Sequence, residues 1–361
     1  MKYINYIILF SLCAILFVAD AQAGNTDRVG QAGAMELLLN PWARSSGFNS
    51  MNSATVQGIE AMRLNAGGLA RMGLGSMNEE SKTQVLFSST QYLSGSGVSL
   101  SAFGFGQRMG ESGVLGLNVV SMGFGEQDVT TISAPEGGTG ATFEIQLVNL
   151  GVSYARSFSN SIHVGFVGRM ISESIFDVTA SGIAFDMGIQ YVTGPQDNVH
   201  FGVSLRNIGT PLQFKGDGLS VKLPVNGGYN ITVNNQADRF ELPSVLNIGV
   251  GYDMHLDSAD RHVLSFVGNF TSNAFNKDYL GAGISYTYNK RFSVRAAYRY
   301  EDGIDGDLDF TQRTSEFTGL SAGVSVEVPI KEGGSSIGFD YAYRGTASYN
   351  NNHTIGVRLN L

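Results

Sequence analysis

Apolar and polar residues alternate along most of the chain from residue 82 onward, and a period of two is that of a β-strand. In Val199-His200-Phe201-Gly202-Val203-Ser204-Leu205-Arg206 the odd positions are apolar and the even positions are polar or glycine. The same pattern predicts strands near 82–93, 97–107, 113–125, 143–156, 161–172, 182–193, 199–208, 244–256, 262–273, 279–289, 292–301, 319–329, 336–344 and 352–361. The chain is therefore expected to be all-β over residues 82–361.

The distribution of charge between the two faces indicates what surrounds these strands. In Phe292–Tyr300, for example, the apolar face carries no charge, and the opposite face holds Ser293, Arg295, Ala297 and Arg299. A soluble antiparallel sheet can alternate in the same way, but glycine is depleted in ordinary strands and here recurs on the polar faces. Segments of about ten residues with apolar-out, polar-in alternation are typical of outer-membrane barrels. We therefore predict a 14-stranded antiparallel transmembrane β-barrel whose small inward residues leave room for a plug.

The connections between the predicted strands support this topology. If the barrel begins and ends in the periplasm, the turns on that side are all short: 108–112, 158–160, 194–198, 257–261, 290–291 and 330–335. The long connections, 126–142, 209–243 and 302–318, then all fall on the other side, as outer-membrane barrels require. The final strand, Thr354–Leu361, has the spacing of a barrel-assembly signal. We expect a bacterial outer-membrane location, with outer-membrane lipid around the barrel and both termini periplasmic.

The first 23 residues have the features of a secretory signal peptide. Lys2 supplies the positive charge, Ile4–Val18 the apolar stretch, and Ala21-Gln22-Ala23 the cleavage site. The apolar stretch is short for a membrane-spanning anchor, which disfavours that alternative. Cys13 is the only cysteine, so the mature chain is expected to have no disulfide.

Residues 24–81 do not alternate and are expected to form a small, partly helical plug. Ala54–Met62 has helical content, and Asn52 or Ser53 could cap its N-terminus. Gly67-Gly68 is expected to end the helix.

This segment also carries a resemblance to a known family. Leu64-Asn65-Ala66-Gly67-Gly68-Leu69-Ala70, which follows Gly58–Met62, resembles the N-P-A-G-L-A block of the FadL-like barrels. It is most similar to the PorV/PorQ branch, although Ala66 replaces the usual Pro and the upstream Asp-Asp pair is absent. The resemblance implies a 14-stranded FadL-like barrel with an N-terminal plug, in which the motif residues are Asn65, Gly67, Gly68 and Leu69.

The same resemblance implies two functions. Barrels of the FadL branch carry hydrophobic molecules across the outer membrane. Barrels of the PorV branch act in type IX secretion, where they bind a large translocon and hand over secreted cargo proteins.

Composition excludes several other classes. The net charge of −8 argues against nucleic-acid binding. A chain that is 11% aromatic and 43% hydrophobic is not expected to be disordered. No run of 18 apolar residues follows the first 20, so a helical membrane protein is not expected.

The sequence contains only weak signals for a catalytic or metal site. The five histidines have no metal-binding spacing and no G-x-S-x-G motif occurs, so we predict neither catalytic residues nor a cofactor. Asp305, Asp307, Asp309 and Glu316 have an EF-hand-like spacing, but Phe310 stands where glycine is needed. A solvated acidic loop is the favoured interpretation, and a weak Ca²⁺ site is the alternative.

Charged residues at inward positions are the more informative set. They are Arg169, Arg206, Arg295, Arg299, Arg344 and Arg358 with Asp186, Asp253, Glu327 and Asp340. Because buried charges must be paired, we expect them to anchor the plug through ion pairs and hydrogen bonds; a polar solute path is the alternative. Apolar plug residues could still line a ligand pocket, namely Met35, Leu37, Leu38, Leu39 and Trp42.

The sequence thus leaves two functions open. The first is a non-enzymatic PorV/PorQ-type component that binds and hands over secreted proteins, with 209–243 and 302–318 as its partner surface. The alternative is a FadL-like transporter of hydrophobic small molecules that works through movement of the plug.

Overall fold

The computed structural model describes residues 28–74, 77, 81–225, 228–306, 313, 315–330 and 334–361. The predicted signal peptide, residues 1–23, lies outside these residues and stays a prediction. Among the described residues, no helix is long and apolar enough to cross a membrane.

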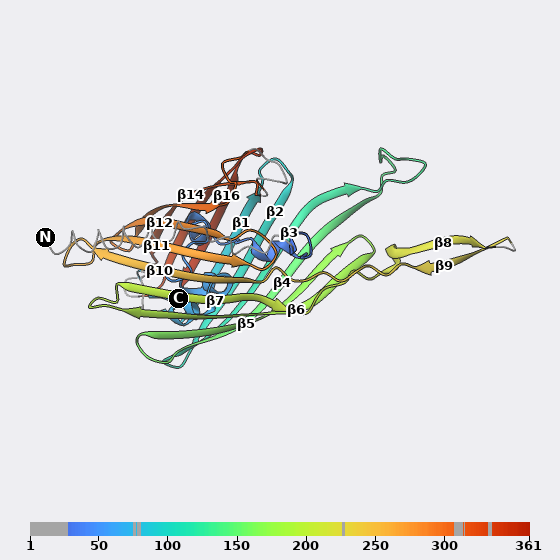
Figure 1. Cartoon of the computed structure of the whole chain (residues 1–361). Helices are drawn as coiled ribbons and strands as arrows, with labels where there is room; N and C mark the ends of the chain where they lie inside the picture. The colour runs from blue at the N-terminus through green and yellow to red at the C-terminus, as the bar shows by residue number, and fades with distance from the viewer. Residues whose placement is uncertain are drawn as a thin grey trace.

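A closed antiparallel barrel of fourteen strands dominates the described part of the chain (Figure 1), which confirms the predicted fold. β1 (Thr83–Tyr92) closes the barrel because it pairs with both β2 (Val98–Met109) and β16 (Asn352–Asn360). The other strands are β3 (Gly113–Asp128), β4 (Thr142–Ser157), β5 (Ile162–Ile175), β6 (Val178–Thr193), β7 (Val199–Gly209), β10 (Val245–His255), β11 (His262–Asn273), β12 (Tyr279–Tyr288), β13 (Phe292–Glu301), β14 (Phe317–Pro329) and β15 (Ser336–Thr346).

The two faces of each strand meet different surroundings. In β6 the side chains of Phe185, Met187 and Ile189 are exposed on the outer wall, whereas those of Asp186 and Gln190, at alternate positions, are buried inside. Successive side chains of a strand point to opposite faces, so one pattern supplies both a lipid-facing surface and a polar lumen. This is the apolar-out arrangement that the sequence predicts.

The connections sort by length as expected. The three long ones, 129–141, 210–244 and 302–316, lie at the same end of the barrel, hereafter the loop end, because each joins an upward strand to a downward one. The opposite end, which carries the short turns and the C-terminal residue Leu361, is the turn end; there Lys82 donates its backbone N–H to the Leu361 carbonyl at 2.8 Å.

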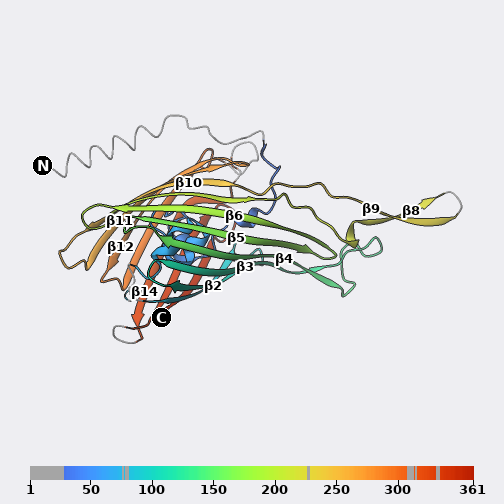
Figure 2. The same cartoon turned by 90° about the horizontal axis from the view of Figure 1, so that it is seen from below.

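The connection 210–244 contains structure that we did not predict. After the short 3₁₀ helix η5 (Asp217–Leu219) it forms a separate two-stranded sheet of β8 (Ser220–Val225) and β9 (Tyr229–Asn234). This hairpin projects beyond the barrel wall in both views (Figures 1 and 2).

Residues 28–74 fill the barrel interior with four short helices: η2 (Met35–Leu38), α2 (Ala43–Gly47), η3 (Gly58–Arg63) and η4 (Ala66–Arg71). The predicted helix over Ala54–Met62 is wrong in its limits and type, since η3 is a 3₁₀ helix that begins at Gly58. Gly67-Gly68 does not end it; both glycines lie within η4, which Asn65 caps. Packing against the wall, which the local sequence does not encode, sets these limits.

Glycines on the inner wall explain how so much chain fits inside. A Cβ on Gly104 would lie 2.3 Å from the Ile59 side chain, and one on Gly165 would lie 2.1 Å from the Ala66 carbonyl oxygen. Only hydrogen at these positions allows the plug to approach the wall so closely. The abundance of glycine on the polar strand faces is therefore a consequence of the plug.

The first described residues lie at the loop end. The Arg28 guanidinium carbon lies 4.0 Å from the centre of the Phe275 ring, between β11 and β12, and Ala32 bridges to Glu241. The prediction placed both termini at the turn end. The C-terminal strand ends at the turn end. Arg28, the first described residue, lies at the loop end, because the plug runs from the loop end inward before the chain reaches β1.

Candidate functional site

The residues of the plug motif hold the plug against the barrel wall. Asn65 donates its side-chain amide to the Ile189 carbonyl at 3.0 Å and accepts the Gly67 N–H at 3.1 Å, so it fixes η4 against β6. A Cβ on Gly67 would lie 2.7 Å from the His163 carbonyl oxygen. Leu69 is fully buried in the apolar core. These residues therefore set how η4 lies on the wall.

Two inward arginines bind the plug through backbone carbonyls. Arg169 forms an ion pair with Asp186 at 2.6 Å and donates to the Met62 carbonyl at 3.2 Å. Arg206 donates to the Leu37 carbonyl at 3.0 Å. The carboxylate that pairs with Arg169 thus comes from the neighbouring strand β6, and the plug contributes only neutral carbonyl acceptors.

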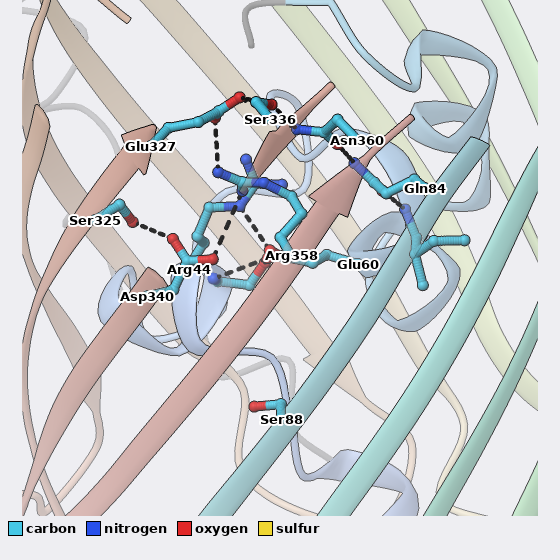
Figure 3. A network of polar contacts seen from close by, with 12 residues as sticks. Arg44, Glu60, Gln84, Ser88, Ser325, Glu327, Ser336, Asp340, Arg358 and Asn360 are labelled. Carbon is cyan, nitrogen blue, oxygen red and sulfur yellow. Dashed lines mark hydrogen bonds and ion pairs between the residues drawn. The ribbon is translucent and has the colours of Figure 1, made fainter. Parts of the chain in front are cut away.

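A second polar cluster lies where β14, β15 and β16 meet α2 and η3 (Figure 3). Arg358 pairs with Glu327 at 2.9 Å and with Asp340 at 3.6 Å. Within the plug, Arg44 pairs with Glu60 at 2.6 Å, and the three carboxylates lie around the two arginines.

The remaining predicted lumen charges have varied partners. Arg295 donates to the Ser325 hydroxyl at 2.6 Å and lies 5.7 Å from the centre of the Phe48 ring. Asp253 accepts from His200 at 2.9 Å. The last two, Arg299 and Arg344, lie at the loop end beside aromatic rings.

Taken together, the ion pairs of the described wall residues join wall residues to one another. The hydrogen bonds of these charges to the N-terminal segment go to its backbone: Arg169 and Arg206 donate to carbonyls, and Glu327 accepts the Met77 N–H at 3.2 Å. Anchoring of the plug by these charges remains a proposal, in which the wall pairs hold the guanidinium groups in place for the carbonyl contacts.

The plug carries charges that the sequence analysis did not single out: Glu36, Glu60, Arg63 and Arg71 are buried, and Arg44 is half-buried. Burial raises the pKa of the Glu36 carboxyl and lowers the pKa of Arg71 to about 10. Charged residues between apolar and glycine neighbours, as in Gly58–Arg63, were the available signal.

The lumen is asymmetric in polarity. Along β2 and β3 its inner wall is mainly apolar or glycine, from Val98 at the loop end past Leu100 and Val120 to Val114 near the turn end. The inner faces of β1 and β4 are mixed and also carry Gln84, Ser88, Thr90, Asn149 and Ser153. The plug presents Trp42, Ile59, Met62, Leu64, Leu69 and Met72 to this wall. We call this region the apolar lining. Elsewhere the inward residues are mainly Ser, Asn, Thr and charged side chains.

A second apolar cluster closes the loop end over β5–β7. Leu37 packs there with Ile171, Leu212 and Leu242. The connection 210–244 reaches this position because Lys215 pairs with Thr179 of β6 and Leu212 pairs with Phe240. Of the plug residues expected to line a pocket, Leu37 and Trp42 are buried, while Met35 is exposed.

The proposed Ca²⁺ loop stays untested, since Asp307 and Asp309 lie outside the described residues. Glu316 accepts a hydrogen bond from the Ser348 backbone N–H at 2.5 Å. No group of three or more potential metal ligands occurs within the part of the chain that the structure describes.

Comparison with known proteins shows the fold. No family model and no curated protein matches the chain. Similar solved structures include a TodX deltaS2S3 mutant, a monoaromatic hydrocarbon channel, at 12% identity with a TM-score of 0.53, which covers 88% of this chain and 97% of that chain.

Two further structures have the same architecture. A Pseudomonas aeruginosa FadL homologue has 11% identity and a TM-score of 0.51, over 88% of this chain and 97% of that chain. The Ralstonia pickettii toluene transporter TbuX has 13% identity and a TM-score of 0.50, over 89% and 97%. The fold is therefore that of the FadL-like outer-membrane barrels.

Proposed function

We propose that this protein lets small apolar molecules pass through the outer membrane along the apolar lining, by displacement of the plug. The observation that carries the proposal is the asymmetry of the lumen. An inner wall that only had to hold a plug would not need apolar side chains on β2 and β3 from one end to the other. The toluene transporter and hydrocarbon channels with this fold support the same class of solute.

The contacts of the plug suggest which part moves. On the polar side, η4 is bonded to the wall through Asn65, and Arg169 holds the Met62 carbonyl. On the apolar side, Ile59, Met62 and Leu69 meet β2 and β3 only through van der Waals contact. Apolar contacts are not directional, so a small apolar molecule can replace them without leaving a polar group unpaired.

Entry of an apolar dye into whole cells tests this proposal. Cells with the wild-type barrel should take up N-phenyl-1-naphthylamine faster than cells without it. Val120→Asn places an amide in the apolar lining and should slow uptake, because the amide must lose its hydration. Ser285→Asn is the matched control, since Ser285 is also inward and buried but lies on β12.

Equal uptake with and without the protein would refute the proposal. Equal slowing by both variants would show that a general loss of fold, rather than the apolar lining, governs uptake.

A second candidate function, docking of another protein as in secretion, is favoured by the β8–β9 hairpin. Its cross-strand pairs Val221–Val233, Leu223–Ile231 and Val225–Tyr229 place six apolar residues on one face. The alternate positions, such as Lys222 and Thr232, are polar. Two-stranded sheets are marginally stable alone in water, and an exposed apolar face typically marks an interaction site.

Affinity purification from native outer membranes, followed by mass spectrometry, tests docking. The wild-type chain should recover a large outer-membrane secretion barrel or secreted cargo, and Ile231→Asp should lose it. Thr232→Asp adds the same charge to the polar face and should retain it. If the wild-type chain recovers neither, docking is refuted while passage of apolar molecules is unaffected.

A further inference from the structure

Arg344 is a buried cation without an acidic partner. It is inward on β15 and 8% exposed, and its guanidinium carbon lies 4.0 Å from the centre of the Phe317 ring. Its Nε has no hydrogen-bond acceptor, and no ion pair to it occurs among the described residues. The titratable groups that act on it are Arg299, Tyr92 and Tyr279. In contrast, Arg169, Arg358 and Arg44 each have a carboxylate within 2.9 Å.

Aromatic rings and a second arginine surround this cation. Arg299 lies 4.7 Å from the Tyr279 ring centre and 5.9 Å from that of Phe317. Tyr92 meets the Phe317 ring edge-on, with 6.1 Å between centres. Tyr92, Tyr279 and Phe317 are the terminal residues of β1, β12 and β14, and all three are at the loop end. The cluster therefore stands at the mouth of the lumen.

The carboxylates nearby are already engaged. Glu301 lies 3.7 Å from Arg299, which also donates to the Ser315 hydroxyl at 3.3 Å. Glu316 accepts the Ser348 N–H. Within the described residues the cluster thus holds two guanidinium groups, the Glu301 carboxylate paired with Arg299, and the Glu316 carboxylate, which acts on Tyr92 but not on Arg344. A buried charge without a counter-charge is costly, so this mouth favours an anion.

We propose that Arg344, Arg299, Phe317, Tyr92 and Tyr279 form a binding site for small aromatic carboxylates. A carboxylate has two oxygens in one plane and matches the fork of a guanidinium group. In an aromatic acid the ring is conjugated with the carboxylate and extends the plane of the guanidinium group. The Arg344 guanidinium lies over the Phe317 ring, which Tyr92 meets edge-on, so ring contacts there favour an aromatic body.

The site leads into the apolar lining, because Tyr92 packs against that cluster as well. It goes beyond the proposed passage of apolar molecules, since its ligand is charged and binding does not require the plug to move. A binding measurement therefore stands apart from the dye-uptake test, and either can fail alone.

Isothermal titration of the full mature chain in detergent with sodium benzoate tests the site. The wild-type protein should bind benzoate saturably. Arg344→Met should weaken binding about tenfold to a hundredfold, the equivalent of a charge-assisted hydrogen bond. Arg156→Met, which removes an exposed arginine far from the mouth, should leave binding unchanged.

Two further measurements distinguish loss of the site from loss of the fold and establish which anion the site prefers. Arg344→Lys keeps the charge but loses the fork, so it should bind benzoate more weakly than the wild type. Inorganic phosphate should bind more weakly than benzoate. Absence of benzoate binding, equal binding by Arg344→Met, or tighter binding of phosphate would each overturn the proposal.

Discussion

Replacement of a wall glycine tests how the plug is seated. Gly165 on β5 faces the lumen, and a Cβ there would lie 2.1 Å from the Ala66 carbonyl oxygen and 2.9 Å from the Gly67 backbone nitrogen. A carbon–oxygen contact normally needs about 3.3 Å. Both close atoms belong to the backbone of η4, so Gly165→Ala should push η4 away from β5 by about an ångström.

The magnitude follows from what that displacement breaks. Overpacking by one methyl group costs about 1–3 kcal/mol. The hydrogen bonds from Asn65 to the Ile189 carbonyl and from Arg169 to the Met62 carbonyl, at 3.0 and 3.2 Å, would stretch. At about 1 kcal/mol for each bond, the contact between plug and wall should lose roughly 3–5 kcal/mol in total.

Single-channel conductance in planar bilayers and thermal unfolding in detergent measure the effect. Gly165→Ala should melt at a lower temperature and show openings more often than the wild type. Gly168→Ala is the matched control on the same strand, because its Cβ points outward and lies 3.9 Å from the Phe185 ring. If both variants conduct and melt like the wild type, the wall glycines do not seat the plug.

Three further changes test single interactions, each by thermal unfolding. Burial raises the pKa of Glu36, so its ionised form destabilises the fold; Glu36→Gln should melt above the wild type at pH 8, and the gap should close as the pH falls through the raised pKa toward the ordinary value of about 4.3. A gap that widens on acidification would contradict this. Arg169→Met leaves the Asp186 carboxylate buried without its ion-pair partner and should cost about 3–5 kcal/mol, and adding Asp186→Asn should recover part of the loss; no recovery would mean that the ion pair is not the cause. Asn65→Ala removes the η4 cap and should cost about 1–2 kcal/mol, whereas Asn65→Asp keeps the capping oxygen and should melt closer to the wild type.

The strands were predictable because their signal is local. Each strand separates two environments, so the identity of every second residue reports its face regardless of the rest of the chain. The two strands that we missed, β8 and β9, follow the same rule: Tyr229, Ile231 and Val233 of β9 alternate with the polar residues Asn230 and Thr232. We did not predict these two strands because they lie inside a long connection between barrel strands, not because their pattern is weak.

The helices of the plug were harder to predict. Residues 54–62 have helical composition, but 3₁₀ helices and tight contacts with wall glycines decide the backbone. The partner of Gly165, for instance, is Ala66, some hundred residues earlier in the chain.

The sequence by itself determined the barrel, its inward charges and the sorting of its loops, because these depend on which side of each strand a residue occupies. Only the tertiary structure decided which charges meet, that the lumen is mainly apolar along β2 and β3 and mainly polar elsewhere, and that Arg344 lacks an acid while Arg169 has one. Those outcomes depend on the path of the plug through the barrel and on strands that neighbour one another only after closure. No local pattern records either of them.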